Sequence, residues 1–535
     1  IEMQEVMWDL IPCPIYFRNQ HEYMVILRQM HRHKREMLVF VRRVSYNDVQ
    51  RGDETMGIIN VEFGTSDAET ELIRSPQVFD KAFFDPHNYL DELVNGYRFI
   101  VSGRKGDGKS AYLAKLKRLA DEENCLETIG VSLERLNSKF FEKFTDQDLV
   151  GGKRYVPMWK CILLLELVKH FEVRGFQIQR PNYISLVDAL NKLGLLHGDS
   201  VEETITKLDA TDISINVRDW VSYGRHVEKE AVIRGANQIY SVLSEELKSA
   251  YLGHKKFRMV LDGLDDILRN KEFSIEIITG LLRAANEINN FFNKKSLNFK
   301  IIVLIRTDIL DKCRDPDISK INLASQINLS WKPGSSNYDS DLAKLILARF
   351  YMQGDDRTFV QIWHSYFPYQ VDEKNSLAYM LDNTLYKPRD MLMFFSLAQR
   401  MIGDCDRQLS EYEFKLLLTK YSEEYFVGHM QDELTGFLPD EAINELQSVI
   451  SKIGSRRFSY EAFALEISQH KEFEGIQAED VLKLLFERGY VGQYRKRPDH
   501  PKEEFFFQTH INPNEKYVKE DDCNLHRGLV RAFGV

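Results

Sequence analysis

The sequence predicts an α/β fold, namely a parallel β-sheet with helices on both faces, followed by a helical domain and a winged-helix domain. Two observations support this prediction. Between about residues 61 and 335, short apolar runs bounded by polar turns alternate with segments of helical periodicity, which is the pattern of a covered parallel sheet. Residues 458–510 then follow the order helix, turn, helix, strand and return strand, which is typical of a winged helix.

The elements along the chain divide it into four parts. Residues 1–60 match no pattern that we can name, and they are a candidate effector or partner-binding segment. The stretch FGTSDAETE (63–71) opens the next part, with Ser66 or Asp67 as a candidate helix cap. The parts that follow are expected to be a core at 61–335 with a helical insertion at about 137–250, a helical lid at 336–440 and a winged helix at 441–535.

The expected core strands are apolar runs of four to seven residues or so, each ending in a polar turn. A helical pattern at residues 110–122 follows the first strand after a short loop. The remaining runs are separated by long helical stretches, which suits crossover connections between parallel strands. The predicted strands are 97–101, 127–133, 257–261, 300–305 and 326–329.

The composition is that of an ordinary globular chain. Of the 535 residues, 43% are hydrophobic and 28% are charged, and the formal net charge is −10. This charge excludes a protein that coats nucleic acid along its whole surface, although a local basic patch stays possible. No apolar run reaches the roughly eighteen residues that a membrane span needs, and the start lacks a signal-peptide pattern. The six cysteines are far apart, so we expect reduced thiols and a cytoplasmic protein. We also expect no membrane partner, because no apolar run is long enough to span a bilayer.

A glycine-rich loop joins the first core strand to the first core helix. The stretch YRFIVSGRKGDGKSAYLAKLKRLA (97–120) fits G-x-x-x-x-G-K-[ST] in full, and a plain glycine-rich turn is the alternative. Glycines let successive N–H groups turn towards an anion, and the following helix presents its positive end to the same anion. Lys109 would reach the β- and γ-phosphates, and Ser110 would ligate Mg²⁺. The residues predicted to bind the nucleotide are Gly103, Arg104, Lys105, Gly106, Asp107, Gly108, Lys109, Ser110 and Ala111.

A carboxylate for the magnesium ion is expected at the end of a neighbouring strand. The stretch FRMVLDGLDDIL (257–268) places Asp262 at that position, where it would hold Mg²⁺ through water. Asp265 and Asp266 follow on the turn, and Asp266 is the preferred candidate to orient the attacking water. The alternative is an acidic loop that caps a helix.

Three arginines are candidates for contacts with the phosphates. Arg306 ends the apolar run FKIIVLIR (299–306) and would sense the γ-phosphate together with Thr307, unless it forms only a strand-end salt bridge. Arg389 follows Pro388 at an expected helix start and would contact phosphate from the lid, unless it is a surface arginine of a capped helix. Arg314 is a candidate for a finger that acts on a neighbouring copy.

These motifs together resemble P-loop ATPases of the STAND and AAA+ classes. VLDGLDD is similar to the DGLDE of NACHT-type members, and the series FGTSDAETE, FIVSGRKGDGKSA, LIRTDIL, KPRD and LHRGLVRAFG resembles a bacterial P-loop ATPase family often found in anti-phage defence operons. The likeness covers about residues 61–535. Two departures matter: Asp266 stands where the family has Glu, which implies slow hydrolysis, and a helical insertion precedes Asp262.

Three functions are consistent with these observations. The resemblance implies a cytoplasmic, ATP- and Mg²⁺-dependent switch in defence, which hydrolyses ATP and assembles as a homo-oligomer or with an operon-encoded effector. The second is a DNA-binding loader or regulator, but residues 441–535 hold 14 Lys and Arg against 16 Asp and Glu, and only 494–502 is basic. The third is a scaffold that binds ATP without turnover. ATPase measurements with and without DNA would separate the three.

Overall fold

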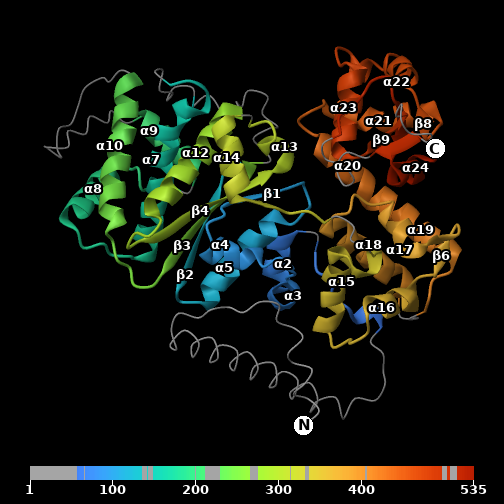
Figure 1. The fold of residues 1–535 in the computed structure, drawn as a ribbon, viewed down its shortest axis with the longest axis horizontal. Helices are drawn as coiled ribbons and strands as arrows, with labels where there is room; N and C mark the ends of the chain where they lie inside the picture. The colour runs from blue at the N-terminus through green and yellow to red at the C-terminus, as the bar shows by residue number, and fades with distance from the viewer. Residues whose placement is uncertain are drawn as a thin grey trace, which may run out of the picture. The chain divides into compact units, whose positions relative to one another are not determined.

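The computed structural model confirms the predicted fold class, with an α/β core, an inserted group of helices, a helical domain and a C-terminal winged helix (Figure 1). Outside the described residues lie residues 1–56 of the predicted segment 1–60, residues 497–502 of the basic stretch 494–502, and the candidates Asp265, Asp266 and Arg314. The structure describes residues 57–65, 67–134, 141, 149–198, 200–210, 229–264, 275–313, 315–331, 336–403, 407–496, 503–506 and 515–535.

Five parallel strands form the core sheet: β1 (Ile100–Gly103), β2 (Leu126–Ser132), β3 (Lys256–Asp262), β4 (Asn298–Arg306) and β5 (Gln326–Asn328). Their order is β2-β3-β4-β1-β5, so β4 lies between β1 and β3. The carboxyl ends of these three strands meet at one edge of the sheet, which is where open α/β sheets bind ligands. The sheet therefore brings the ends of β1, β3 and β4 to a single place.

The first strand begins later than the sequence predicts. The backbone N–H groups of Tyr97 and Arg98 each donate to the Glu92 carboxylate at 3.1 Å, so they are not available for a strand ladder. The strand starts at Ile100 and continues to Gly103, where the glycine-rich loop begins. A contact between neighbouring segments thus overrides the apolar pattern at this position.

Helices cover both faces of the sheet, and alternate strand residues pack against the two layers. Phe257, Met259 and Leu261 of β3 face one layer, whereas Val260 faces the other. The first layer contains α7 (Val156–Arg174) and α12 (Ile275–Phe292), and the second contains α4 (Tyr89–Asn95) and α5 (Lys109–Glu122). Shorter helices complete the core: α2 (Ala68–Arg74), α3 (Pro76–Ala82), α13 (Thr307–Leu310) and α14 (Pro316–Ser325).

Two details of the core follow from its sequence. Asp67, one of the two candidate caps, accepts a hydrogen bond of 2.7 Å from the N–H of Thr70 at the start of α2. Between β2 and β3, helix α7 is followed by α8 (Pro181–Lys192), α9 (Val201–Ala210) and α10 (Lys229–Lys248). These four helices fall within the range where the sequence predicts an insertion, and α10 packs along α7.

The domain after the core is mostly helical. Its helices are α15 (Asp341–Met352), α16 (Phe359–Tyr366), α17 (Ser376–Leu381), α18 (Pro388–Ile402), α19 (Glu411–Tyr421) and α20 (Val427–Leu434). The sequence predicts helices alone in this region, and that prediction missed the short hairpin of β6 (Gln370–Val371) and β7 (Lys374–Asn375). Its turn residues Asp372 and Glu373 have φ of 49° and 60° without the glycine that usually marks such a turn.

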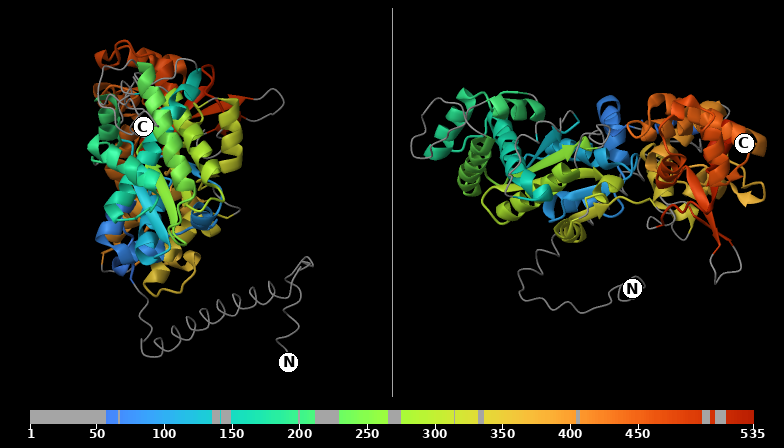
Figure 2. Two further views of the ribbon diagram at one scale, coloured as in Figure 1. Left: turned by 90° about the vertical axis from the view of Figure 1, so that its left-hand side faces the viewer. Right: turned by 90° about the horizontal axis from the view of Figure 1, so that it is seen from above.

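The C-terminal domain has the predicted order of helices and strands. Its elements are α21 (Asp440–Ile453), β8 (Arg457–Phe458), α22 (Tyr460–Ile467), α23 (Ala478–Arg488), β9 (Val491–Lys496), β10 (Glu503–Phe506), β11 (Asp522–Leu525) and α24 (Arg527–Phe533). The sheet order is β10-β9-β11-β8, so β11, which the sequence does not predict, lies between β8 and β9. The hairpin of β9 and β10 projects from the helices of this domain in both views of Figure 2.

Among the described residues, no helix is both long enough and apolar enough to cross a lipid bilayer. The four cysteines in this part of the chain carry free thiols: Cys125, Cys161, Cys313 and Cys523.

Candidate functional site

The loop between β1 and α5 is held in shape by its own groups. Gly106 and Gly108 have φ of 90° and 95°, in the left-handed region that glycine adopts without strain. The Asp107 carboxylate accepts a hydrogen bond of 2.7 Å from the backbone N–H of Arg104. Nζ of Lys109 donates to two carbonyl oxygens of the loop, at 3.3 and 3.2 Å. A Cβ on Gly108 would meet nothing within 4 Å, so the loop is open on that side.

The end of β3 supplies a carboxylate to the start of α5. The hydroxyl of Ser110 donates a hydrogen bond of 2.9 Å to Oδ2 of Asp262, and Oδ1 accepts from the N–H of Gly263 at 2.8 Å. The second bond fixes the orientation of the carboxylate at the end of the strand. A hydroxyl and a carboxylate are hard oxygen donors of the kind that Mg²⁺ prefers, and they leave room for phosphate and water as further ligands. Ser110 and Asp262 therefore fit a magnesium site.

A cavity of about 760 Å³ opens beside this pair. Its polar lining includes residues 105–111, Asp262, Arg306 and Arg389, and it also includes Glu134, just after β2. Apolar side chains also line the cavity, among them Phe79 and Ala82 of α3, Leu345 of α15 and Leu392 of α18. The size and the mixed lining are those of a small-molecule site, and they fit a nucleotide with anionic phosphates and an apolar base.

The structure brings most of the predicted site residues to this cavity. Lys105, Gly106, Asp107, Gly108, Lys109, Ser110 and Ala111 line it together with Asp262, Arg306 and Arg389. Gly103 and Arg104 shape the loop behind it, and Nη2 of Arg104 donates to the carbonyl of Tyr386 in the lid at 3.4 Å. Asp265 and Asp266 lie outside the described residues, so their roles stay predictions.

The two predicted phosphate sensors reach the cavity from different elements. Nε and Nη2 of Arg306, at the end of β4, donate to Asp308 at 2.9 and 3.0 Å. The strand-end salt bridge that the sequence left open is therefore present, and the same arginine lines the cavity. Arg389 lies in the first turn of α18, which begins at Pro388 as predicted. A Cβ on Gly106 would lie 3.6 Å from the Cβ of Arg389, so the lid approaches the loop backbone closely.

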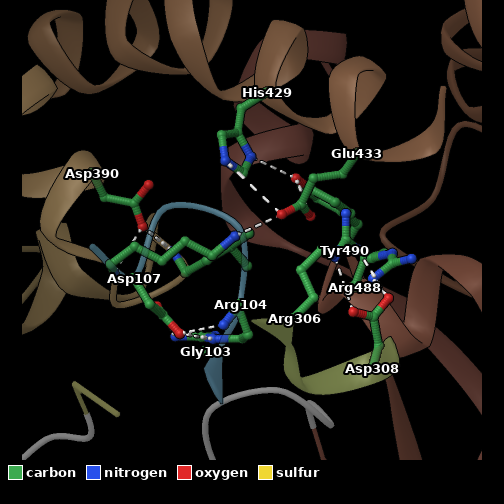
Figure 3. Close-up of polar contacts among 12 residues, drawn as sticks. Gly103, Arg104, Asp107, Arg306, Asp308, Asp390, His429, Glu433, Arg488 and Tyr490 are labelled. Atoms are coloured by element: carbon green, nitrogen blue, oxygen red, sulfur yellow. Dashed lines mark hydrogen bonds and ion pairs between the residues drawn. The ribbon is translucent and has the colours of Figure 1, made fainter. Parts of the chain in front are cut away.

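A buried group of charged residues lies behind the loop, and the sequence did not reveal it (Figure 3). Nζ of Lys387 donates to Glu433 at 2.9 Å, and the hydroxyl of Tyr490 donates to the same carboxylate at 3.1 Å. Nδ1 of His429 lies 2.9 Å from that hydroxyl. A Cβ on Gly106 would lie 3.4 Å from Cδ of Lys387 and 3.8 Å from Nε2 of His429, so the group touches the loop.

The charges in this group set its protonation. Burial alone would raise the pKa of Glu433, but Lys387 and other cations hold that pKa well below its ordinary value. The pKa of Asp308 is also low, because Arg488 and Arg306 outweigh the effect of burial. Burial and Lys387 lower the pKa of His429 to about 3, so this ring is neutral near pH 7. Lys387 is therefore paired with Glu433, and Arg306 and Arg488 are paired with Asp308, while the neutral His429 adds no charge beside the loop.

Comparison with known proteins gives a family match for part of the helical domain. Residues 340–427 match the FunZ-associated C-terminal helical domain. The putative transposon gamma-delta 80.3 kDa protein of Escherichia coli (strain K12) is 21% identical over 355 residues, which are 63% of this chain and 46% of that protein. The chain thus spans about half the length of this curated relative.

Among solved structures, the chain is similar at low level to the following three proteins. They are Cdc6p of Pyrobaculum aerophilum (TM-score 0.29, 14% identity, 86% of this chain and 98% of that one), ORC1 of Aeropyrum pernix in complex with DNA (0.36, 13%, 86% and 96%) and ORC2 of Aeropyrum pernix in its ADP form (0.31, 12%, 86% and 96%). A likeness of this degree assigns neither a family nor an activity to the chain.

Proposed function

We propose that the protein is an ATP-binding and ATP-hydrolysing molecular switch that uses Mg²⁺. The observation that carries this proposal is the Ser110–Asp262 hydrogen bond beside a glycine-rich loop and a cavity of about 760 Å³. A hydroxyl and a carboxylate for a metal, a lysine and a glycine-rich loop for phosphates, and an apolar surface for a base then lie in one place. This combination is what a P-loop nucleotide site requires.

Each group has a distinct task in the proposed reaction. The loop N–H groups and Lys109 would hold the β- and γ-phosphates, and Ser110 and Asp262 would hold the metal ion, Asp262 through water. When bound, Mg²⁺ would neutralise charge that builds up on the phosphates. Asp266, with Asp265 beside it, is proposed to orient the attacking water. Aspartate is one methylene shorter than the glutamate of the similar family, so we expect slow turnover.

Two arginines would detect whether the bound nucleotide carries a γ-phosphate. Arg306 comes from the core and Arg389 from the lid, and both line the same cavity. A γ-phosphate that contacts both would hold lid and core together, and its loss on hydrolysis would release them. Such differential contact with two states is the physical requirement for a ligand-driven change.

The finer biological role rests on the sequence resemblance alone. By that resemblance, we propose a cytoplasmic role in bacterial anti-phage defence, in which the nucleotide state controls a homo-oligomer or an operon-encoded effector. Arg314 would act as a finger only if a neighbouring copy completes the site. A nuclease or another toxic protein encoded by a neighbouring gene would support this role.

Binding of DNA by the winged helix has less support. The exposed residues of α23, the second helix of its helix pair, are Glu479, Asp480, Lys483 and Glu487. Three acidic side chains against one basic side chain would repel a phosphate backbone. The last residue of the same helix, Arg488, is paired with Asp308 of the core. These contacts favour a winged helix that docks on protein.

The test compares three nucleotide states. We expect ATPγS with Mg²⁺ to compact the protein or change its assembly in scattering and sedimentation, and ADP to leave both as in the nucleotide-free protein. Arg389→Ala should abolish the difference. Arg400→Ala is the matched control, because Arg400 lies on the same helix but is exposed and pairs with Glu424 at 3.1 Å. Identical profiles in all states would reject the switch, and ATPase activity that depends on DNA would favour the loader.

A further inference from the structure

Asp308 is shared by two arginines that come from different domains. Arg306, at the end of β4, donates to both carboxylate oxygens of Asp308, at 2.9 and 3.0 Å. Arg488, the last residue of α23 in the winged helix, donates to Oδ2 of the same carboxylate at 2.6 Å. Figure 3 shows the two guanidinium groups converging on this one side chain. The winged helix is thereby joined to a residue that lines the cavity.

Arg488 is held in place by more than this ion pair. Its guanidinium lies over the ring of Phe437, 4.8 Å from the centroid, and Phe437 itself lines the cavity. The Arg488 side chain is only 8% exposed. Two residues further along the chain, Tyr490 donates to the buried Glu433, which Lys387 also binds. The winged helix therefore reaches the back of the site through one buried and one partly buried polar contact.

We propose that Asp308 and Arg488 are positioning residues for Arg306, so that the winged helix takes part in distinguishing ATP from ADP. The inference rests on the proposed function. A carboxylate that binds two nitrogens of a guanidinium fixes the plane of that group. An arginine held in this way loses less conformational entropy when it binds a phosphate. Asp308 would thus hold Arg306 ready at the cavity.

Arg488 has a complementary role. If a γ-phosphate draws Arg306 towards itself, the Asp308 carboxylate loses part of the positive charge that balances it. A partly buried carboxylate without a balancing cation has an unfavourable free energy. Arg488 remains beside Asp308 and supplies the balancing positive charge. Without Arg488, Asp308 would retain Arg306 more strongly and the phosphate would compete less well. Both positioning residues should therefore affect the response to the γ-phosphate and leave the binding of the diphosphate unchanged.

The experiment measures the dissociation constants of ATPγS and ADP with Mg²⁺ by calorimetry and takes their ratio for each variant. Arg306→Met should reduce the preference for ATPγS, and Asp308→Asn and Arg488→Met should reduce it in the same direction, by roughly tenfold. The affinity for ADP should not change. Adding Asp308→Asn to Arg306→Met should cause little further loss, because the two act through one contact.

Arg495→Met is the matched control. Arg495 pairs with Asp521 at 2.7 Å and with Glu515 at 2.5 Å, and both partners belong to the winged helix. Its loss removes an arginine–carboxylate pair of similar burial without touching the Asp308 contact, so the ratio should stay as in the wild type. Arg488→Lys and Asp308→Glu keep the charges, and they serve if the first variants do not fold. These two should give ratios between the wild type and Arg306→Met.

The outcomes separate this inference from the proposed function. If Arg306→Met lowers the ratio but the Asp308 and Arg488 variants match the wild type, the inference is overturned and the nucleotide switch stands. The inference is also overturned if the wild-type protein binds both nucleotides equally, because Arg306 then senses nothing. If the wild-type protein binds neither nucleotide, the proposed function itself fails.

Discussion

Ser110 and Asp262 are separated by 152 positions in the chain, yet Oγ of Ser110 donates to Oδ2 of Asp262 at 2.9 Å. The sheet order produces this contact. β1 leads into the loop that precedes Ser110, β3 ends at Asp262, and only β4 lies between the two strands. Two residues that the sequence assigns separately to one metal ion are thus brought together by the parallel sheet.

The first prediction concerns this pair. Asp262→Ala should weaken the binding of Mg²⁺–ATP and also lower turnover, because the metal acts in both the ground state and the transition state. The measurement is calorimetry with and without EDTA, together with an ATPase assay. With EDTA, the wild type and the variant should bind ATP with similar affinity. A loss of affinity that is just as large in EDTA would remove Asp262 from the metal site.

The second prediction concerns the attacking water. Asp266→Ala should lower kcat by about 10²- to 10⁴-fold and leave the Kd for ATP nearly unchanged, because orienting the water matters only in the transition state. Asp265→Ala, on the same turn, is the matched comparison. Single-turnover kinetics and equilibrium binding provide the two numbers. If Asp262→Ala and Asp266→Ala have equal effects on both numbers, these roles are wrong.

The third prediction concerns the loop lysine. Lys109→Ala should weaken ATP binding by about 3 kcal/mol, or roughly 100-fold, because it removes charged hydrogen bonds to phosphate. The fold should survive, since Lys109 contributes little apolar packing. Lys115→Ala on the same helix is the control, because Lys115 pairs with Asp80 at 3.0 Å and does not line the cavity. Wild-type affinity in Lys109→Ala would remove this loop from the nucleotide site.

Local patterns in the sequence were enough to predict the fold class, and they also pointed to the loop residues, Asp262, Arg306 and Arg389 that line the cavity. The apolar runs of β3 and β4 indicate buried strands because each is covered on both faces, and Gly106 and Gly108 mark a backbone conformation that other residues rarely adopt. The lid helix start at Pro388 follows from proline's fixed φ. These signals are local, so they can be read without the three-dimensional structure.

The charged group behind the loop could not be predicted in this way. Glu433 pairs with Lys387, 46 positions away, and Asp308 pairs with Arg488, 180 positions away. Each of these residues lies in or beside an ordinary amphipathic helix, where a charge is usually on the solvent side. Burial of these charges depends on how the core, the helical domain and the winged helix pack together, and the spacing of residues in the sequence does not indicate that packing. The strand β11 was not predicted for a similar reason, because it pairs with β8, which lies at the other end of the winged-helix sequence.

The fourth prediction concerns the buried pair of Lys387 and Glu433, whose side chains are 2% and 3% exposed. Lys387→Met should lower the free energy of unfolding by about 3–5 kcal/mol, because it leaves a buried carboxylate without its partner. Lys387→Met combined with Glu433→Gln should recover much of that loss. Urea denaturation followed by tryptophan fluorescence measures both changes.

A matched control for that pair is available on the surface. Lys344 and Asp339 lie 3.0 Å apart with exposed side chains, so Lys344→Met should cost no more than about 1 kcal/mol. An equal cost for Lys344→Met and Lys387→Met would contradict the importance of burial. A double variant less stable than Lys387→Met would contradict the explanation that the loss comes from a buried carboxylate left without its cation.

The last prediction concerns pH. His429 lies among Lys387, Glu433 and Tyr490, with Arg389 and Lys105 close enough to act on it, and burial followed by Lys387 lowers its pKa from 6.5 to about 3. Between pH 6.5 and about 3, the unfolded chain binds a proton at this ring that the folded chain does not bind. The stability from this group is therefore complete above pH 6.5 and falls by up to about 1.4 kcal/mol per pH unit below it.

His429→Gln removes the titrating ring, so its free energy of unfolding should decline less between pH 7.5 and 5.5 than that of the wild type. His87→Gln is the control, because the side chain of His87 is 54% exposed, and it should decline as the wild type does. Parallel curves for the wild type and His429→Gln would show that His429 titrates normally, and the ring could then carry a charge next to the loop at neutral pH.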